Sequence, residues 1–120
     1  LLADARHAGV PVSAAVEGIP VPLPPSIDLS AYRIVQEGLT NVIKHAGHAS
    51  AQVLVRYTGR ALELQVTDDG PGGPAGPSGG HGLLGVRERV ALFGGTFQAG
   101  NRAEGGFGLR ALLPLDEAPR

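Results

Sequence analysis

Residues 32–46 have the sequence Y-R-I-V-Q-E-G-L-T-N-V-I-K-H-A, and their spacing predicts an amphipathic helix. Successive side chains of an α-helix lie about 100° apart, which gathers the apolar residues on one face. That face holds Tyr32, Val35, Leu39, Val42, Ile43 and Ala46. The opposite face combines a carboxylate, an amide, an ammonium and an imidazole, from Glu37, Asn41, Lys44 and His45. We expect the first face to pack in a core, while the second is either an ordinary polar face or part of a binding site.

The composition is that of a single folded domain. The chain has 120 residues, of which 42% are hydrophobic, so it can bury a core. Its net charge of −1 predicts no bulk attraction to nucleic acid or to a membrane surface. The chain has no cysteine, which excludes a disulfide framework, a thiolate metal site and a cysteine nucleophile. No apolar run in the sequence approaches the length of a transmembrane helix.

The other segments predict five strands and a second helix. Alternating apolar residues indicate strands at 10–16, 51–57, 61–67, 96–99 and 109–113. A second helix is expected at 83–93, and either Ser26 or Asp28 is expected to cap the first. This order of elements predicts an α+β fold over residues 1–120. We expect a two-layer α/β sandwich, in which helices cover one face of a mixed, mostly antiparallel sheet.

Residues 66–73 have the sequence V-T-D-D-G-P-G-G, in which two acidic residues follow the strand at 61–67 and precede a glycine-rich stretch. Asp68 comes at the end of the strand, while Gly70 and Gly72 would let the backbone approach a ligand closely. A partly buried Asp68 could accept a hydrogen bond from an exocyclic amine such as that of adenine. Asp-Gly is also common in plain turns, so this motif alone leaves both interpretations open.

The segment G-G-H-G-L-L-G, Gly79 to Gly85, is expected to open the second helix. Free N–H groups and the dipole at a helix N-terminus form an anion site, and glycine removes the steric obstacle. The residues from Gly80 onwards match the dinucleotide fingerprint G-x-G-x-x-G. That fingerprint follows a strand directly, whereas here a mobile loop of glycine and proline is predicted over residues 70–82. A P-loop lysine is absent as well.

The polar face of the first helix offers groups for phosphate chemistry. Asn41 presents an amide oxygen that suits Mg²⁺ when phosphates and waters complete the coordination shell. Glu37, one turn earlier, could orient or deprotonate a nucleophile. Lys44 and His45 could contact phosphate oxygens. His45 could equally be a cation that the dipole stabilises at the C-terminal end of the helix.

Together and in this order, the three motifs resemble the ATP-binding catalytic domain of sensor histidine kinases. That family belongs to the superfamily of gyrase, heat-shock chaperone and mismatch-repair ATPases, which have the Bergerat fold. Residues 32–46 resemble its N box, D-D-G-P-G its G1 box and G-H-G-L-L-G-V-R-E-R its G2 box. The sequences Y-R-I-V-Q-E and G-L-L-G-V-R-E-R are most similar to those of the nitrate-sensor-like subfamily. The resemblance covers nearly the whole chain.

The resemblance implies a site for Mg²⁺ and ATP. Asn41 would ligate the Mg²⁺ that bridges the phosphates, and Glu37 would assist phosphoryl transfer. Asp68 would hold the adenine amine in a pocket that Gly70 and Gly72 shape. The remaining nucleotide contacts would come from Lys44, His45, Gly80, His81, Gly82 and Leu83. Residues 70–82 would form a short ATP lid.

The resemblance also implies partners. The γ-phosphoryl group would pass to a histidine on an upstream dimerisation domain, and from there to an aspartate of a response regulator. That histidine is none of the four in this chain, and residues 1–8 are expected to be the trailing end of the upstream helix. We expect a cytoplasmic parent protein that forms a homodimer, with or without a membrane anchor. This domain itself would contact neither nucleic acid nor membrane.

The sequence departs from the family pattern at G-G-F-G-L, Gly105 to Leu109, where many members carry a threonine that reaches the adenine-site aspartate. A water or Thr67 could substitute, and we assign the role to neither. Two alternative functions are a serine kinase of the anti-sigma-factor type and a nucleotide-sensing or protein-interaction module without catalysis. Residues 1–8 and Y-R-I-V-Q-E disfavour the first, and the intact pair of Glu37 and Asn41 disfavours the second. A nicotinamide-binding domain is the least favoured.

Overall fold

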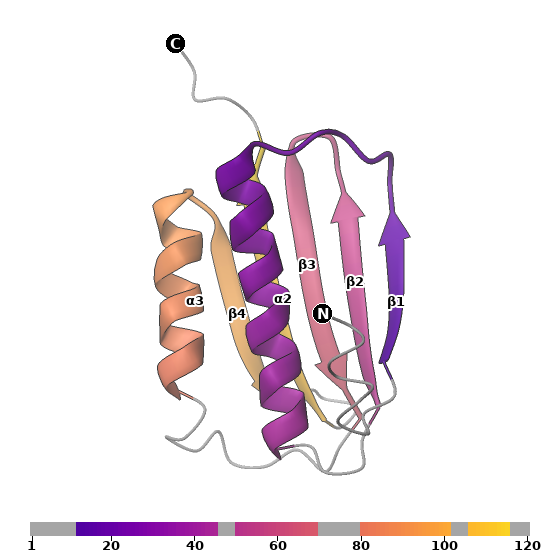
Figure 1. The fold of residues 1–120 in the computed structure, drawn as a ribbon, viewed down its shortest axis with the longest axis vertical. Helices are drawn as coiled ribbons and strands as arrows, with labels where there is room; N and C mark the ends of the chain where they lie inside the picture. The colour runs from indigo at the N-terminus through magenta and orange to yellow at the C-terminus, as the bar shows by residue number, and fades with distance from the viewer. Residues whose placement is uncertain (1–11, 46–49, 70–79, 102–105, 116–120) are drawn as a thin grey trace.

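The computed structural model describes residues 12–45, 50–69, 80–101 and 106–115. Its elements are β1 (Val12–Glu17), α2 (Pro25–His45), β2 (Ala51–Tyr57), β3 (Ala61–Asp68), α3 (Gly80–Leu92), β4 (Thr96–Asn101) and β5 (Phe107–Pro114). The strands form one sheet in the order β1-β2-β3-β5-β4. Strand β1 pairs parallel with β2, and the other neighbours are antiparallel. Figure 1 shows both helices on one face of this sheet. The predicted two-layer α+β sandwich is thereby confirmed.

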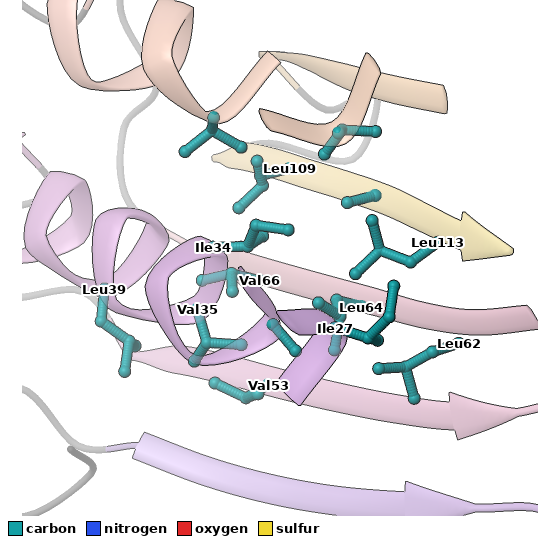
Figure 2. Close-up of a cluster of buried hydrophobic side chains, with 14 of the residues drawn as sticks. Ile27, Ile34, Val35, Leu39, Val53, Leu62, Leu64, Val66, Leu109 and Leu113 are labelled. Atoms are coloured by element: carbon teal, nitrogen blue, oxygen red, sulfur yellow. The ribbon is translucent and has the colours of Figure 1, made fainter. Parts of the chain in front are cut away.

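The core lies between α2 and the middle of the sheet. Alternation along β3 sends Leu62, Leu64 and Val66 toward the helices, and all three are almost fully buried. Figure 2 shows Ile34 and Val35 of α2 on the same side of the sheet as Leu64 and Val66 of β3. Burying one such aliphatic side chain contributes about 1.5–3 kcal/mol, so this layer holds the site-bearing helix in place.

Helix α2 begins at Pro25, seven residues before the amphipathic stretch 32–46 and ahead of both predicted caps. The Asp28 N–H already donates to the Pro24 carbonyl at 2.9 Å, which is the first helical bond. Neither Ser26 nor Asp28 is therefore the cap, and both lie inside the first turn. Proline suits this position because its missing N–H would have no helical partner there.

The buried side of α2 also differs from the predicted stripe. Tyr32 is 49% exposed, whereas Ile34 is fully buried. The helix lies close to the sheet at Gly38, where an added Cβ would lie 2.9 Å from the Val66 Cβ. Val35 and Leu39 are buried as predicted, but a residue without a side chain carries no weight in an apolar pattern, so the predicted stripe does not include Gly38.

Helix α3 starts at Gly80 rather than Leu83, so the last three residues of the predicted loop are helical. Val86 and Val90, one turn apart on α3, are buried in the core. Gly94 ends the helix with φ +74°, and its N–H donates to Ala91 at 2.9 Å. Neither α2 nor α3 combines the length and the apolarity that a membrane crossing requires.

The sheet face away from the helices carries a ladder of charges. Glu63 on β3 is buried there and accepts hydrogen bonds from Arg56 on β2, Gln65 on β3 and Arg110 on β5. Arg56 also pairs with Glu17 on β1 at 2.9 Å. The hydrogen bond from Gln65 and the positive charges of the two arginines hold the pKa of Glu63 below its ordinary value, against burial, which raises it.

Candidate functional site

Three of the segments that the sequence singled out meet at one end of the molecule. Figure 1 shows β3 and α2 ending, and α3 beginning, at the same end of the sandwich. Strand β3 delivers Asp68 there, the last turns of α2 deliver Asn41, and the first turn of α3 starts at Gly80. Residues 70–79, including Gly70 and Gly72, lie outside the described residues, as do residues 1–8.

Asp68 is a buried carboxylate at the end of β3, with 5% of its surface exposed. Its Oδ1 accepts a hydrogen bond from the Phe107 backbone N–H at 3.3 Å. Phe107 is the first residue of β5, the strand that pairs with β3 up to Thr67 and Gly108. The carboxylate is therefore held by the neighbouring strand of the same sheet.

The adjacent Asp69 has a different role. It is exposed, and its Oδ1 accepts the Ser50 N–H at 2.7 Å. Its own N–H donates to the Ser50 carbonyl at 3.2 Å. These two bonds extend the pairing of β2 and β3 by one residue, so Asp69 supports the sheet while Asp68 lies in the interior.

Glu37 and Asn41 lie one turn apart on α2, and both are half-buried. Asn41 comes seven residues after the fully buried Ile34, which places the two on the same side of the helix. The predicted arrangement, with the polar residues opposite the core, is therefore wrong for these two. They flank the sheet-facing side of α2, because that side is centred on Ile34 and Gly38.

Lys44 and His45 belong to the last turn of α2, and their side chains lie outside the described part of the structure. The same holds for the side chains of His81 and Leu83 in the first turn of α3. What the fold provides at this end of α3 is backbone. The first four N–H groups of a helix have no partner within it, and in a 13-residue helix they carry the positive end of the dipole.

One group at the site escaped the sequence analysis. Residues 105–109 contain no hydroxyl side chain, and the partner of Asp68 in β5 is a backbone N–H. Backbone donors have no signature in a sequence. The available signal was Gly105-Gly106 directly before a strand, since a glycine there indicates close approach of another backbone.

The arrangement suits a ligand with an amine at one end and anionic oxygens at the other. A buried carboxylate accepts hydrogen bonds, and a helix N-terminus attracts anions. Amide and carboxylate oxygens, as in Asn41 and Glu37, are hard donors that fit Mg²⁺. Within the described ranges, no three His, Cys, Asp or Glu side chains gather as a metal site would need.

Comparison with known proteins agrees with this geometry. The model of a family described as histidine kinase-, DNA gyrase B- and HSP90-like ATPase matches residues 27–117. The sensor histidine kinase LnrJ of Bacillus subtilis (strain 168) is 35% identical over 110 residues, which are 92% of this chain and 27% of that protein. The histidine-protein kinase/phosphatase UhpB of Salmonella typhimurium is 40% identical over 69 residues, or 57% of this chain and 14% of that protein.

Among solved structures, the histidine kinase domain of the blue-light activated histidine kinase from Erythrobacter litoralis EL346 has a similar fold. Its TM-score is 0.70 at 27% sequence identity, and the match covers 94% of this chain and 60% of that one. The chain spans about a quarter of the length of LnrJ, so it corresponds to one part of that protein. By sequence and by fold, the chain belongs to the histidine kinase-, DNA gyrase B- and HSP90-like ATPase family.

Proposed function

We propose that this chain binds Mg²⁺ and ATP and donates the γ-phosphoryl group to a histidine on a separate phosphoacceptor domain. The observation that carries the proposal is the buried Asp68 carboxylate at the end of the sheet where α3 begins. A carboxylate that accepts from an amine and a helix end that attracts phosphates together match the two ends of ATP. Membership of an ATPase family that includes histidine kinases supports this.

In this proposal Asp68 accepts a hydrogen bond from the adenine amine, with Gly70 and Gly72 forming the pocket around the base. The N–H groups of the first turn of α3 receive the phosphates. The residues of that turn are Gly80, His81, Gly82 and Leu83. Lys44 and His45, at the end of α2, line the phosphates and ribose. Residues 70–79 close over the nucleotide as a lid. Residues 80–82, which the predicted lid of residues 70–82 included, belong to α3.

Asn41 supplies the amide oxygen that would hold Mg²⁺, and the phosphates and water supply the other ligands. When bound, the ion neutralises charge on the transferring phosphoryl group. Glu37 sits one turn before Asn41 on the same flank of α2 and would orient the incoming histidine or accept its proton. Phosphoryl transfer needs positioning and charge stabilisation more than covalent chemistry from the protein, so these half-buried polar groups suffice.

The partners follow from the reaction. The acceptor histidine would lie on an upstream dimerisation domain, and a response regulator would receive the phosphoryl group next. Relatives that are longer than this chain and are named sensor histidine kinases support the proposal of a phosphoacceptor domain. We also propose a cytoplasmic, homodimeric parent protein, within which this domain contacts neither nucleic acid nor membrane.

Substitution of Asn41 tests the metal role. Asn41→Ala removes the proposed ligand, so the affinity for ATP with Mg²⁺ should fall at least about tenfold, as expected for losing one contact of about 1.4 kcal/mol. Calorimetric titration of the chain, with and without Mg²⁺, measures this. Gln98→Ala is the matched control, because Gln98 is an exposed amide on β4, paired with Arg110 on the opposite face of the sheet. Equal affinity in parent and Asn41→Ala would remove Asn41 from the site.

A further inference from the structure

The turn that leads into β5 touches Asp68 at two places. Gly106 has φ +83°, and an added Cβ would overlap the Asp68 backbone carbonyl and lie 3.1 Å from its Oδ1. The next residue, Phe107, donates its N–H to the same Oδ1. Gly106 therefore lies directly against the Asp68 backbone, and Phe107, the first residue of β5, holds the Asp68 carboxylate.

The positive φ and the close approach are separate constraints. Gly59 in the hairpin between β2 and β3 also has a positive φ, +91°, but an added Cβ there would meet nothing within 4 Å. Gly106 alone of these two needs the space as well as the conformation. The side chain of Phe107 packs against the core cluster, which anchors the donor N–H in position.

We propose that Gly106 and the Phe107 N–H position the Asp68 carboxylate and thereby set the purine selectivity of the site. A carboxylate held in one orientation accepts hydrogen from the 6-amino group of adenine and repels the 6-oxo group of hypoxanthine or guanine. Selectivity of this kind needs a rigid acceptor, because a carboxylate that turns freely can avoid the wrong base.

This inference rests on the proposed function, since it assumes that Asp68 meets the base. ATP and inosine triphosphate (ITP) differ in the 6-substituent and in the hydrogen on N1, so their affinity ratio reports on how the site recognises that edge of the base. The parent chain should prefer ATP at least about tenfold, equivalent to about 1.4 kcal/mol. Competition against a fluorescent nucleotide measures both affinities. A parent chain that binds ATP and ITP equally would end the proposed role of Asp68 before any variant is made.

The variants separate positioning from general stability. Gly106→Ala should reduce the ATP-to-ITP ratio at least about fivefold, while Gly59→Ala, which has the same backbone strain without the contact, should keep the parent ratio. Phe107→Pro deletes the donor at the first residue of a strand, where proline is tolerated, and should also lower the ratio. Phe107→Leu keeps both the N–H and an apolar anchor and should not.

A ratio that stays at the parent value in Gly106→Ala and Phe107→Pro would overturn the inference, even if both affinities fell together. A measurement on the unmodified chain covers the case in which the turn variants do not fold. In ¹⁵N-resolved NMR spectra, the Phe107 amide proton should shift when ATP binds and shift less with ITP. An amide resonance that does not distinguish the two nucleotides would overturn the inference as well.

Discussion

Asp68 and Asp69 are neighbours with the same side chain and different expected roles, so the same substitution at each tests the role of Asp68. Asp68→Asn keeps the size and removes the charge that would accept the adenine amine, so the affinity for ATP should fall about tenfold to a hundredfold, that is, by about 1–3 kcal/mol. Asp69→Asn makes the same chemical change at the exposed residue bonded to Ser50, and ATP affinity should change less than twofold. Calorimetry on both variants measures the difference. Equal losses would mean that charge near the site matters rather than the contact of Asp68 with the base.

Asp68 could be chosen over Asp69 from the sequence, because alternation along residues 61–67 put the first aspartate at the strand end. The hydrogen-bond partner of Asp68 could not be predicted in the same way. The Phe107 N–H carries no residue identity, and it reaches Asp68 only because β5 lies beside β3. Sequence alone predicts a local element well, but a hydrogen bond between two residues 39 positions apart depends on the order of the strands in the sheet.

At the scale of elements, α2 tests how a helix chooses its buried side. Ile34→Ala should lower the free energy of unfolding by about 2–5 kcal/mol, because a fully buried side chain leaves a cavity. Tyr32→Ala, at a position that the apolar pattern assigned to the core while it left out Ile34, should cost less than about 1 kcal/mol, since half of the side chain is already in water. Urea unfolding of the two variants gives the comparison. A larger loss for Tyr32→Ala would restore the predicted stripe.

The existence of α2 was predictable because its apolar period extends over four turns. Its rotation was not, because Gly38 is invisible to a hydrophobic pattern while it decides where the helix meets Val66. Glu37 and Asn41 lie together beside Gly38 on the helix surface, so their position relative to the sheet depends on the same residue. The start of the helix was missed because Pro25, the last of four prolines in residues 20–25, begins the first turn.

For the whole molecule, the charge ladder on the open face links β1, β2, β3 and β5 and gives stability a pH dependence. The pKa of Glu63 is lower in the folded chain than its ordinary value of 4.5. The stability that ionised Glu63 contributes is therefore complete above that value and is lost as the pH falls through the lower, folded pKa. Glu63→Gln removes this titration.

Urea unfolding between about pH 3 and pH 6 measures the effect. The parent should lose stability more steeply than Glu63→Gln below about pH 4.5, while at neutral pH the variant should be less stable by about 1 kcal/mol, because solvent screens both arginines. Glu17→Gln is the control, since its carboxylate is half exposed and meets Arg56 alone among the described ion pairs. Parallel curves for parent and Glu63→Gln would show that the ladder does not titrate with folding.

The sheet order has a consequence for how the protein is made. The last strand in the sequence, β5, occupies an interior place between β3 and β4, and it also carries the donor for Asp68. On the ribosome, β3 emerges long before the strand that will cover its open edge, so neither the sheet nor the hydrogen bond to Asp68 can be completed until translation has passed Pro114. A nascent chain that stalls before Phe107 would expose the bare edge of β3, which makes it a substrate for chaperones rather than a nucleotide-binding protein.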